Sequence, residues 1–143
     1  MKLTKNFQLE EFLRSGTAIL RNYSEQFRPP DNIVSNLQIL ATELQKVRDL
    51  VGEPMPVTSG WRCNRLNKQV GGSSTSAHLE GLAADVNMGS KEKNEALFEF
   101  VSKLVKSGKL KIDQLINEYD YSWIHFGYRD KEANYRNQIF NVK

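Results

Sequence analysis

The chain has 143 residues, of which 39% are hydrophobic and 26% are charged, so its composition is that of a folded globular protein and excludes general disorder. The net charge is +3 and the basic residues are scattered along the sequence, which argues against a nucleic-acid partner. Cys63 is the only cysteine, so an intramolecular disulfide and a zinc site of paired cysteines are both excluded.

The first third of the chain predicts helices. We expect a short helix around Leu9 to Arg14 and then an irregular stretch up to Pro29-Pro30, since prolines disfavour helix in the residues before them. Asp31 or Asn32 caps a long helix, which stops at Gly52. The stripe that this helix turns to the core consists of Ile33, Leu37, Leu40, Leu44, Val47 and Val51.

The middle of the chain predicts short strands and a small-residue loop. Residues 56–59 form a strand, 64–70 form one or two helical turns, and 71–76 form the loop. A second strand covers 82–88. Its alternation separates Leu82, Ala84, Val86 and Met88 on one face from Ala83, Asp85 and Asn87 on the other.

The last third predicts one helix followed by a hairpin. Ser90 caps the helix and Gly108 ends it. Strands over 111–118 and 123–128 follow, joined by a turn at 119–122. The buried side of the helix is expected to carry Leu97, Phe100, Val101, Leu104 and Val105.

Helices first, and then strands interrupted by one helix, predict an α+β domain with a small, mainly antiparallel sheet flanked by helices. We expect a single domain over 1–143, with 1–30 as an N-terminal extension packed on it, and a monomer. In the polar final fifteen residues, Tyr135 and Phe140 are expected to pack on the rest. The N-terminus lacks the apolar run of a signal peptide and no stretch is long enough to span a bilayer, so no membrane partner is expected.

Two histidines and one aspartate are the residues most suited to chemistry. If the core takes the face of Leu82 and Val86 on one strand and of Ile124 and Phe126 on the other, Asp85 and His125 point together toward the opposite surface. His78 reaches that surface from the loop before it. Two imidazoles and one carboxylate suit a catalytic zinc site, since three protein ligands leave one position for water. A histidine is more often structural than a ligand, so spacing alone leaves both interpretations open.

A zinc site that activates water also needs a base. Glu118 is the first candidate, because it ends one strand just before the turn into the strand that carries His125. Asp120, in the turn itself, is the second. Arg62 can supply a fixed positive charge for a developing oxyanion or for a substrate carboxylate. Ser76 and Trp123 lie beside two of the presumed ligands and are candidates for contact with substrate.

Four groups of residues form a wider pattern. They are Ser59-Gly-Trp-Arg62 with Leu66-Asn67, then Val70-Gly-Gly-Ser73, then Ser76-x-His78-x-x-Gly81-x-Ala83-x-Asp85, and finally Asp113-Gln-Leu-Ile116-x-Glu118 with Trp123-x-His125. This pattern resembles the D-Ala-D-Ala carboxypeptidase-like M15 metallopeptidases. The opening Asn6-Phe-x-Leu-Glu-Glu-Phe12 is similar to the short phage and prophage branch, so the resemblance covers nearly the whole chain.

The resemblance implies His78, Asp85 and His125 as zinc ligands, Glu118 as catalytic base and Arg62 as electrostatic clamp. It implies the fold of the hedgehog and DD-peptidase group, with Zn²⁺ as cofactor in a groove over the sheet. Its members cleave peptidoglycan stem peptides, at the terminal D-Ala or, as endolysins, within the peptide. A protein made in the cytoplasm would then act at the cell wall once it is released or delivered by a phage.

The sequence departs from the family pattern at one position. Several members place the glutamate three residues before the last ligand, where this chain has Ser122, so Glu118 takes that role in preference to Asp120. The same scaffold can bind zinc without cutting. The alternative function is therefore a non-catalytic zinc-binding module of a phage or prophage that recognises peptidoglycan or peptide.

Overall fold

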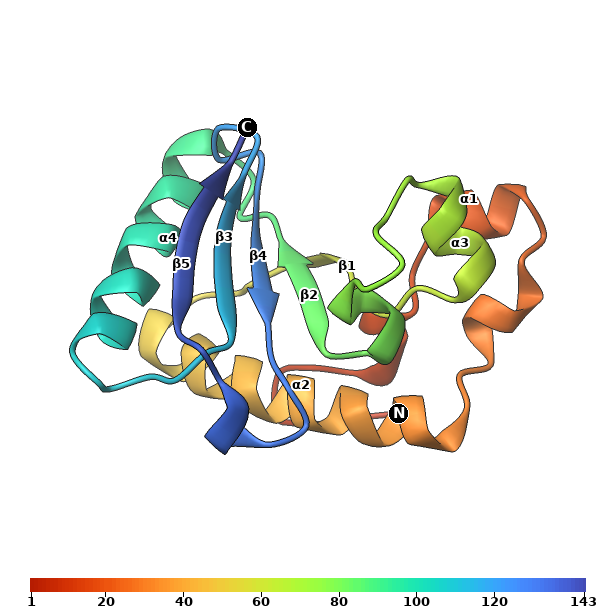
Figure 1. The fold of residues 1–143 in the computed structure, drawn as a ribbon, viewed down its shortest axis with the longest axis horizontal. Helices are drawn as coiled ribbons and strands as arrows, with labels where there is room; N and C mark the ends of the chain where they lie inside the picture. The colour runs from red at the N-terminus through yellow and green to blue at the C-terminus, as the bar shows by residue number, and fades with distance from the viewer.

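A five-stranded sheet with the strand order β1-β2-β4-β3-β5 forms the centre of the protein, and the computed structural model describes all of residues 1–143 (Figure 1). Neighbouring strands are antiparallel except for β3 and β5, which run parallel. The expected α+β class with a mainly antiparallel sheet is confirmed. The strands are β1 (Val57–Ser59), β2 (Ala83–Val86), β3 (Gln114–Glu118), β4 (Trp123–Gly127) and β5 (Gln138–Val142).

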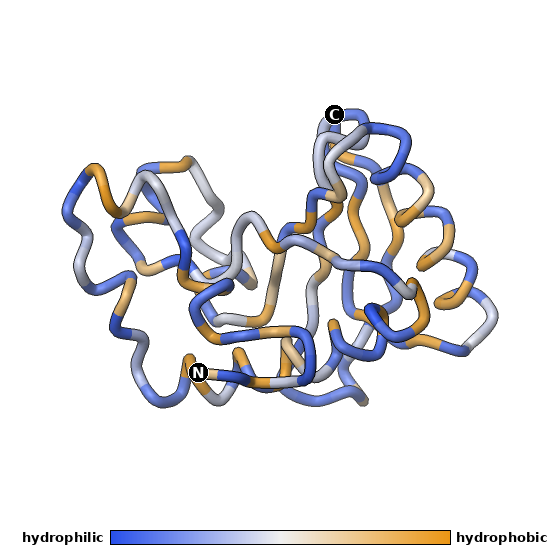
Figure 2. The backbone as a smooth tube through the Cα atoms, turned by 180° about the vertical axis from the view of Figure 1, so that it is seen from behind, coloured by the Kyte–Doolittle hydropathy of each residue, from blue (hydrophilic) through white to orange (hydrophobic).

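Two long helices cover one face of the sheet. In Figure 2 the hydrophobic residues of α4 recur on the side that is turned toward the strands. No helix is both long and apolar enough to cross a membrane. The α-helices are α1 (Gly16–Leu20), α2 (Asp31–Val51), α3 (Asn64–Gln69) and α4 (Lys91–Lys106), and the short 3₁₀ helices are η1 (Leu9–Phe12), η2 (Ser24–Phe27), η3 (Ala77–Glu80) and η4 (Glu132–Asn134).

The core lies between the sheet and these helices. Ile124 and Phe126 of β4 are fully buried, as the alternation along that strand predicts. Phe7 and Phe12 from the N-terminal segment belong to the same cluster of 27 buried residues as the strands. The N-terminal segment therefore contributes to the core itself, which favours one domain; that the whole chain acts as one domain stays a prediction.

The helix stripes are partly as expected. In α2 the predicted stripe residues are buried at Ile33, Leu37, Leu40, Leu44 and Val47, and Val51 is partly buried. In α4 the prediction of Phe100 was wrong: it is 40% exposed, and Phe98 is buried instead. The reason is a buried polar residue, Asn94, which accepts a hydrogen bond from the Met88 N–H and donates to backbone carbonyls of the β3–β4 turn. These bonds fix the rotation of the helix, and hydrophobicity alone does not report them.

Both ends of the chain hold more structure than expected. The stretch before Pro29-Pro30 contains α1 and η2 rather than being irregular. The polar C-terminus forms β5, paired in parallel with β3. Tyr135 packs against Tyr128, as expected, but Phe140 lies on β5 with 37% of its surface exposed. Parallel pairing joins segments distant in sequence, and a polar edge strand has no strong pattern of its own.

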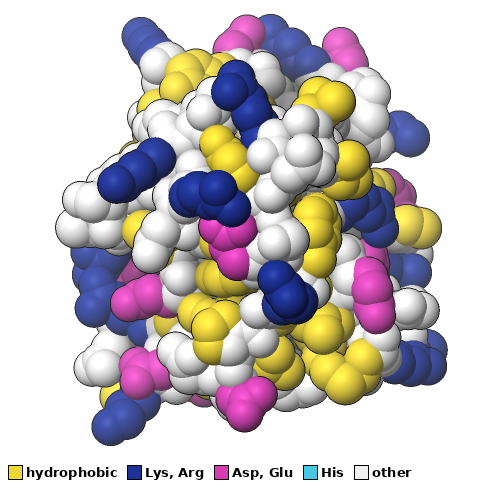
Figure 3. Space-filling model, turned by 90° about the vertical axis from the view of Figure 1, so that its right-hand side faces the viewer, with side chains coloured by type: hydrophobic (Ala, Val, Ile, Leu, Met, Phe, Trp, Pro, Cys, Tyr) yellow, Lys and Arg dark blue, Asp and Glu magenta, His cyan; other side chains and the backbone are white.

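The face formed by the α1 and α3 end of the molecule carries no concentrated charge. Figure 3 shows Lys and Arg side chains spread among acidic and hydrophobic ones, without a continuous basic stripe. No histidine is visible on this face. The imidazoles are instead enclosed, since His78 is 2% exposed and His125 is 8% exposed.

Candidate metal centre

Strand register brings two of the three presumed ligands together. Asp85 of β2 is the direct partner of His125 of β4, so their side chains leave the sheet on the same face. Ile124 and Phe126 point to the opposite face and fill the core. The predicted sharing of one surface by Asp85 and His125 is confirmed, and it follows from alternation together with pairing of the two strands.

His78 reaches the same place from η3. The Ser76 side chain accepts a hydrogen bond from the His78 backbone N–H and caps this short helix. Gly81 ends it with φ of 74°, a left-handed conformation that a side chain disfavours, and then the chain enters β2. The short helix therefore places His78 close above Asp85.

The three side chains converge with distances that suit a metal ion. Asp85 Oδ1 lies 3.3 Å from His78 Nε2 and 3.1 Å from His125 Nδ1. Atoms that each lie about 2.0–2.1 Å from a tetrahedral zinc ion are about 3.3 Å apart. The candidate ligand atoms all lie within 4.8 Å of one another. Two nitrogens and one carboxylate oxygen at this spacing fit zinc, with a fourth position left for water.

The tautomer of His78 is fixed by the hydrogen bond that its Nδ1 makes. His78 Nδ1 donates to the Gly60 carbonyl oxygen at 2.7 Å, which leaves Nε2 free as a ligand. Such an outer hydrogen bond is typical of metal-binding histidines.

Burial by itself raises the pKa of Asp85, but hydrogen bonds with His125 and His78 outweigh it and hold the pKa well below its ordinary range. The carboxylate is therefore ionised.

Glu118 stands at the end of β3, opposite Trp123 in the hairpin. Partial burial raises the pKa of Glu118, while the two histidines and Arg62 oppose the rise and Asp85 adds to it. The turn that follows is strained, because Tyr119, Asp120 and Tyr121 all have positive φ. The Asp120 carboxylate, by contrast, is 75% exposed and pairs with Lys91 Nζ at 2.7 Å. Of the two candidate bases, Glu118 is thus the one whose pKa is affected by the charges of His78, Asp85 and His125.

Arg62 is held close to the same charges. Burial lowers the pKa of Arg62, and the carboxylates of Asp85 and Glu118 counter that effect. Its Nε is buried and has no hydrogen-bond partner. An unpaired guanidinium N–H in a buried position is costly.

The backbone around Arg62 is fixed by a residue that the sequence did not single out. Gln26 is fully buried, and its amide nitrogen donates to the carbonyl oxygens of Trp61 at 2.7 Å and Leu13 at 3.0 Å. Its side-chain oxygen accepts from the Cys63 N–H at 2.8 Å. Gln26 thus holds the residues on both sides of Arg62. Nothing in the sequence marks this glutamine, which lies in a segment without a periodic pattern.

The segment before Arg62 is equally constrained. A Cβ on Gly60 would lie 2.6 Å from the Phe12 carbonyl oxygen, so only glycine fits this approach. The Arg62 N–H donates to the His78 carbonyl oxygen at 3.0 Å. Residues from the N-terminal segment, the loop at 60–63 and η3 therefore form one hydrogen-bonded support under the candidate ligands.

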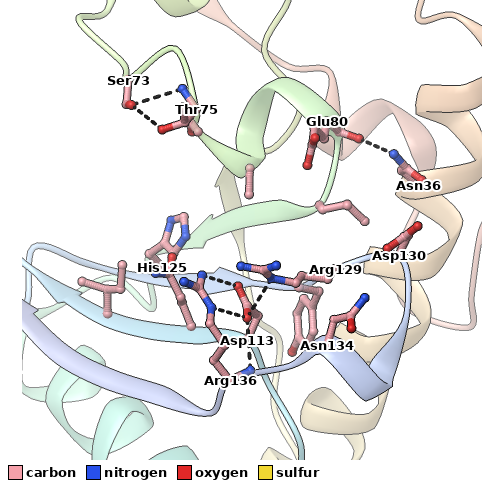
Figure 4. A pocket seen from close by; sticks show the side chains of 16 residues that line it. Asn36, Ser73, Thr75, Glu80, Asp113, His125, Arg129, Asp130, Asn134 and Arg136 are labelled. Carbon is pink, nitrogen blue, oxygen red and sulfur yellow. Dashed lines mark hydrogen bonds and ion pairs between the residues drawn. The ribbon is translucent and has the colours of Figure 1, made fainter.

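A groove of about 820 Å³ opens beside His125 (Figure 4). Ser76 lies in its wall, together with Glu80 and Asn36, while Ile116 and Gln114 of β3 line its floor. Trp123 lies outside this groove, half-buried against the ring of Tyr119 at 5.2 Å between centroids. Of the two residues expected to contact substrate, the structure therefore places Ser76 in the groove and Trp123 on the Glu118 side of the triad.

Comparison with known proteins agrees with this geometry. The family model for Peptidase M15 matches residues 5–127, which include every candidate site residue named from the sequence. The chain belongs to the peptidase M15 family, and the expected family is confirmed. The class is that of metal-dependent peptidases, and the cluster of His78, Asp85 and His125 can hold the metal. No curated protein matches the sequence closely enough to be counted as a relative.

Proposed function

We propose that this protein is a zinc peptidase that hydrolyses peptide bonds in peptidoglycan stem peptides, at the terminal D-Ala or within the peptide. The observation that carries the proposal is the convergence of His78, Asp85 and His125 at ligand spacing, with Glu118 and Arg62 close to the same charges. A bound zinc ion supplies Lewis acidity, which polarises a peptide carbonyl and activates water for attack.

The protein's own residues take the remaining roles. Glu118, whose pKa is raised by partial burial, is suited to accept the proton of the attacking water and to deliver it to the leaving amine. Arg62 offers its unpaired Nε to the negative charge that develops on the carbonyl oxygen. Because Gln26 already holds the backbone on both sides of Arg62, the residue is positioned before the reaction begins.

The phage or prophage origin of the chain and its release to the cell wall belong to the same proposal. Only the sequence resemblance supports them. We also propose that the protein acts as a monomer, with the stem peptide as partner and neither a nucleic acid nor a membrane.

The decisive experiment is a digest of purified muropeptides by the zinc-loaded protein, followed by mass spectrometry. The wild type is expected to release D-Ala or to cut within the stem, and the mass change identifies the bond. Glu118→Gln is expected to keep about one equivalent of zinc while kcat falls about 10²–10⁴-fold, because only the base is lost.

The matched control is Asp120→Asn, which removes a carboxylate from the same hairpin but from an exposed pair with Lys91. Its rate should stay within about twofold of the wild type. If Glu118→Gln retained the full rate, the assigned base would be wrong. If zinc-loaded wild type bound peptidoglycan without changing the mass of any muropeptide, the non-catalytic recognition module would replace the peptidase.

A further inference from the structure

The groove beside His125 contains a cluster of charged residues that the peptidase chemistry does not use. Asp113 lies just before β3 and its side chain is only 7% exposed. Arg129 and Arg136 both bind it, and all three line the same groove as His125 (Figure 4). Both arginines lie after residue 127, outside the part of the chain that the family model matches.

Both carboxylate oxygens of Asp113 accept hydrogen bonds from its two arginine partners. Oδ1 accepts from Arg129 Nε at 3.1 Å, from Arg136 Nε at 2.9 Å and from the Arg136 backbone N–H at 3.1 Å. Oδ2 accepts from Arg136 Nη2 at 2.8 Å. Arg136 is therefore held at two points by the carboxylate, a rigid geometry that neutralises one of the two positive charges.

Arg129 is left with the unused capacity. Only its Nε is bonded, and its two terminal nitrogens make no hydrogen bond to the protein. The edge formed by these two terminal nitrogens can hold a carboxylate by two parallel hydrogen bonds. The Arg129 side chain is 42% exposed and lines the groove, so a ligand can reach it while Asp113 keeps it in place.

The acidic residues of the groove lie elsewhere. Glu80 is in the opposite wall, beside Asn36, and Figure 4 shows Asp130 turned toward α2. Neither forms an ion pair with Arg129. The positive charge on the groove floor is therefore available to a ligand.

The register of β3 and β4 gives the scale of the spacing between the candidate metal centre and this end of the groove. Ile116 is the register partner of His125, and Gln114, next to Asp113, is the partner of Gly127. Two residues of strand span about 7 Å, which is also the length of about two residues of an extended peptide. A substrate whose scissile bond lies at the triad would bring a group about two residues away to Arg129.

We infer that Arg129, held by Asp113 beside Arg136, forms a subsite for a carboxylate of the substrate peptide about two residues from the scissile bond. The inference rests on the proposed function. A stem pentapeptide L-Ala-γ-D-Glu-L-Lys-D-Ala-D-Ala has two free carboxylates, the α-carboxylate of D-Glu and the C-terminal carboxylate. Which of them lies about two residues from the scissile bond depends on the bond that is cut. Both offer the same chemistry to the guanidinium, and the experiment distinguishes them.

The test measures binding rather than turnover. The zinc-loaded Glu118→Gln protein is titrated by calorimetry with the pentapeptide and with two analogues, each amidated at one of the two carboxylates. One analogue is expected to bind about tenfold or more weakly than the acid, which identifies the group that Arg129 contacts. Adding Arg129→Gln should weaken binding of the unmodified pentapeptide to the level of that analogue. The difference in affinity between the two peptides should then disappear.

Two further variants keep the result interpretable. Arg129→Lys retains the positive charge but loses the guanidinium group that can form two parallel hydrogen bonds. It should therefore keep part of the preference for the free carboxylate over the amide. Arg21→Gln removes an exposed arginine that follows the last residue of α1, and this variant should keep the whole preference. Loss of the preference in Arg21→Gln would mean a general charge effect and would overturn the inference.

The inference is also overturned if the acid and both amides bind alike, if no form binds, or if the preference survives in Arg129→Gln. These outcomes are separate from the fate of the proposed function. A protein that prefers the acid but, with Glu118 intact, cuts nothing would keep the subsite and lose the peptidase. A protein that cuts without any preference would do the reverse.

Discussion

The two sides of the candidate metal centre both present arginine, but in opposite states. On one side Arg62 is half-buried, has an Nε without a partner and faces the charges of Asp85 and Glu118. On the other side Arg129 and Arg136 are about two-fifths exposed and share the carboxylate of Asp113. A desolvated arginine with an unmet hydrogen bond suits a charge that exists only during the reaction, whereas an exposed, partly paired one suits a carboxylate already present in the substrate.

The largest expected effect lies at the centre that both sides share. Asp85→Ala removes the oxygen that lies within 3.3 Å of both imidazoles. Metal content, measured by elemental mass spectrometry after purification without chelator, should fall from about one equivalent to near zero. Retention of the metal by Asp85→Ala would show that other residues hold it.

The next effect tests the role of the buried arginine. Arg62→Gln should lower kcat about 10²–10³-fold with zinc content unchanged, since a preorganised donor to the developing charge is lost. KM should change little, whereas Arg129→Gln should act mainly through KM. Steady-state kinetics on one synthetic stem peptide gives both constants. A rise in KM alone for Arg62→Gln would make Arg62 a binding group and remove the contrast between the two sides.

A smaller effect is expected from the support beneath Arg62. Gln26→Met has a similar shape but breaks the bonds to Trp61 and Cys63, so kcat should fall about 10- to 100-fold as Arg62 loses its position. The double variant with Arg62→Gln should be no slower than Arg62→Gln alone, because Gln26 acts through that residue. Additive losses in kcat would instead indicate general damage to the fold, which thermal unfolding of each variant would also report.

The smallest effect concerns stability on the exposed side. Burial raises the pKa of Asp113, but hydrogen bonds from Arg136 and Arg129 outweigh it and bring the pKa below its ordinary value of 3.8. Because the pKa is lower in the folded state than in the unfolded state, the ionised carboxylate stabilises the fold fully above the unfolded-state pKa. This contribution is lost as the pH falls through the folded-state pKa. Asp113→Asn should therefore lower the free energy of unfolding by about 1–2 kcal/mol at pH 7.

The pH dependence separates charge from shape at this position. Urea unfolding of wild type and Asp113→Asn should show a difference that is complete at pH 7 and smaller at pH 3, where the wild-type carboxyl begins to resemble the amide. A difference of the same size at both pH values would assign the loss to altered packing and would contradict the electrostatic account.

Much of the centre follows from the sequence because local rules govern it. Alternation along two strands, together with the turning of their apolar residues to the core, predicts Asp85 and His125 on the face opposite Ile124 and Phe126. The helix stripe from Ile33 to Val47 and the end of α2 at Gly52 depend on spacing and on one glycine. The family was predicted from motif residues. The segments from Ser76 to Asp85 and from Trp123 to His125 carry the resemblance, and the family match over residues 5–127 confirms it.

What only the tertiary structure decided involves contacts between distant segments of ordinary composition. The burial of Gln26 against residues 61–63, the parallel pairing of β5 with β3 and the cluster on Asp113 leave no periodic mark on the sequence. The rotation of α4 that buries Phe98 instead of Phe100 depends on bonds of Asn94 to the turn after β3. Hydrophobic patterns report which residues avoid water, but the partner that each buried polar group finds is known only once the chain is folded.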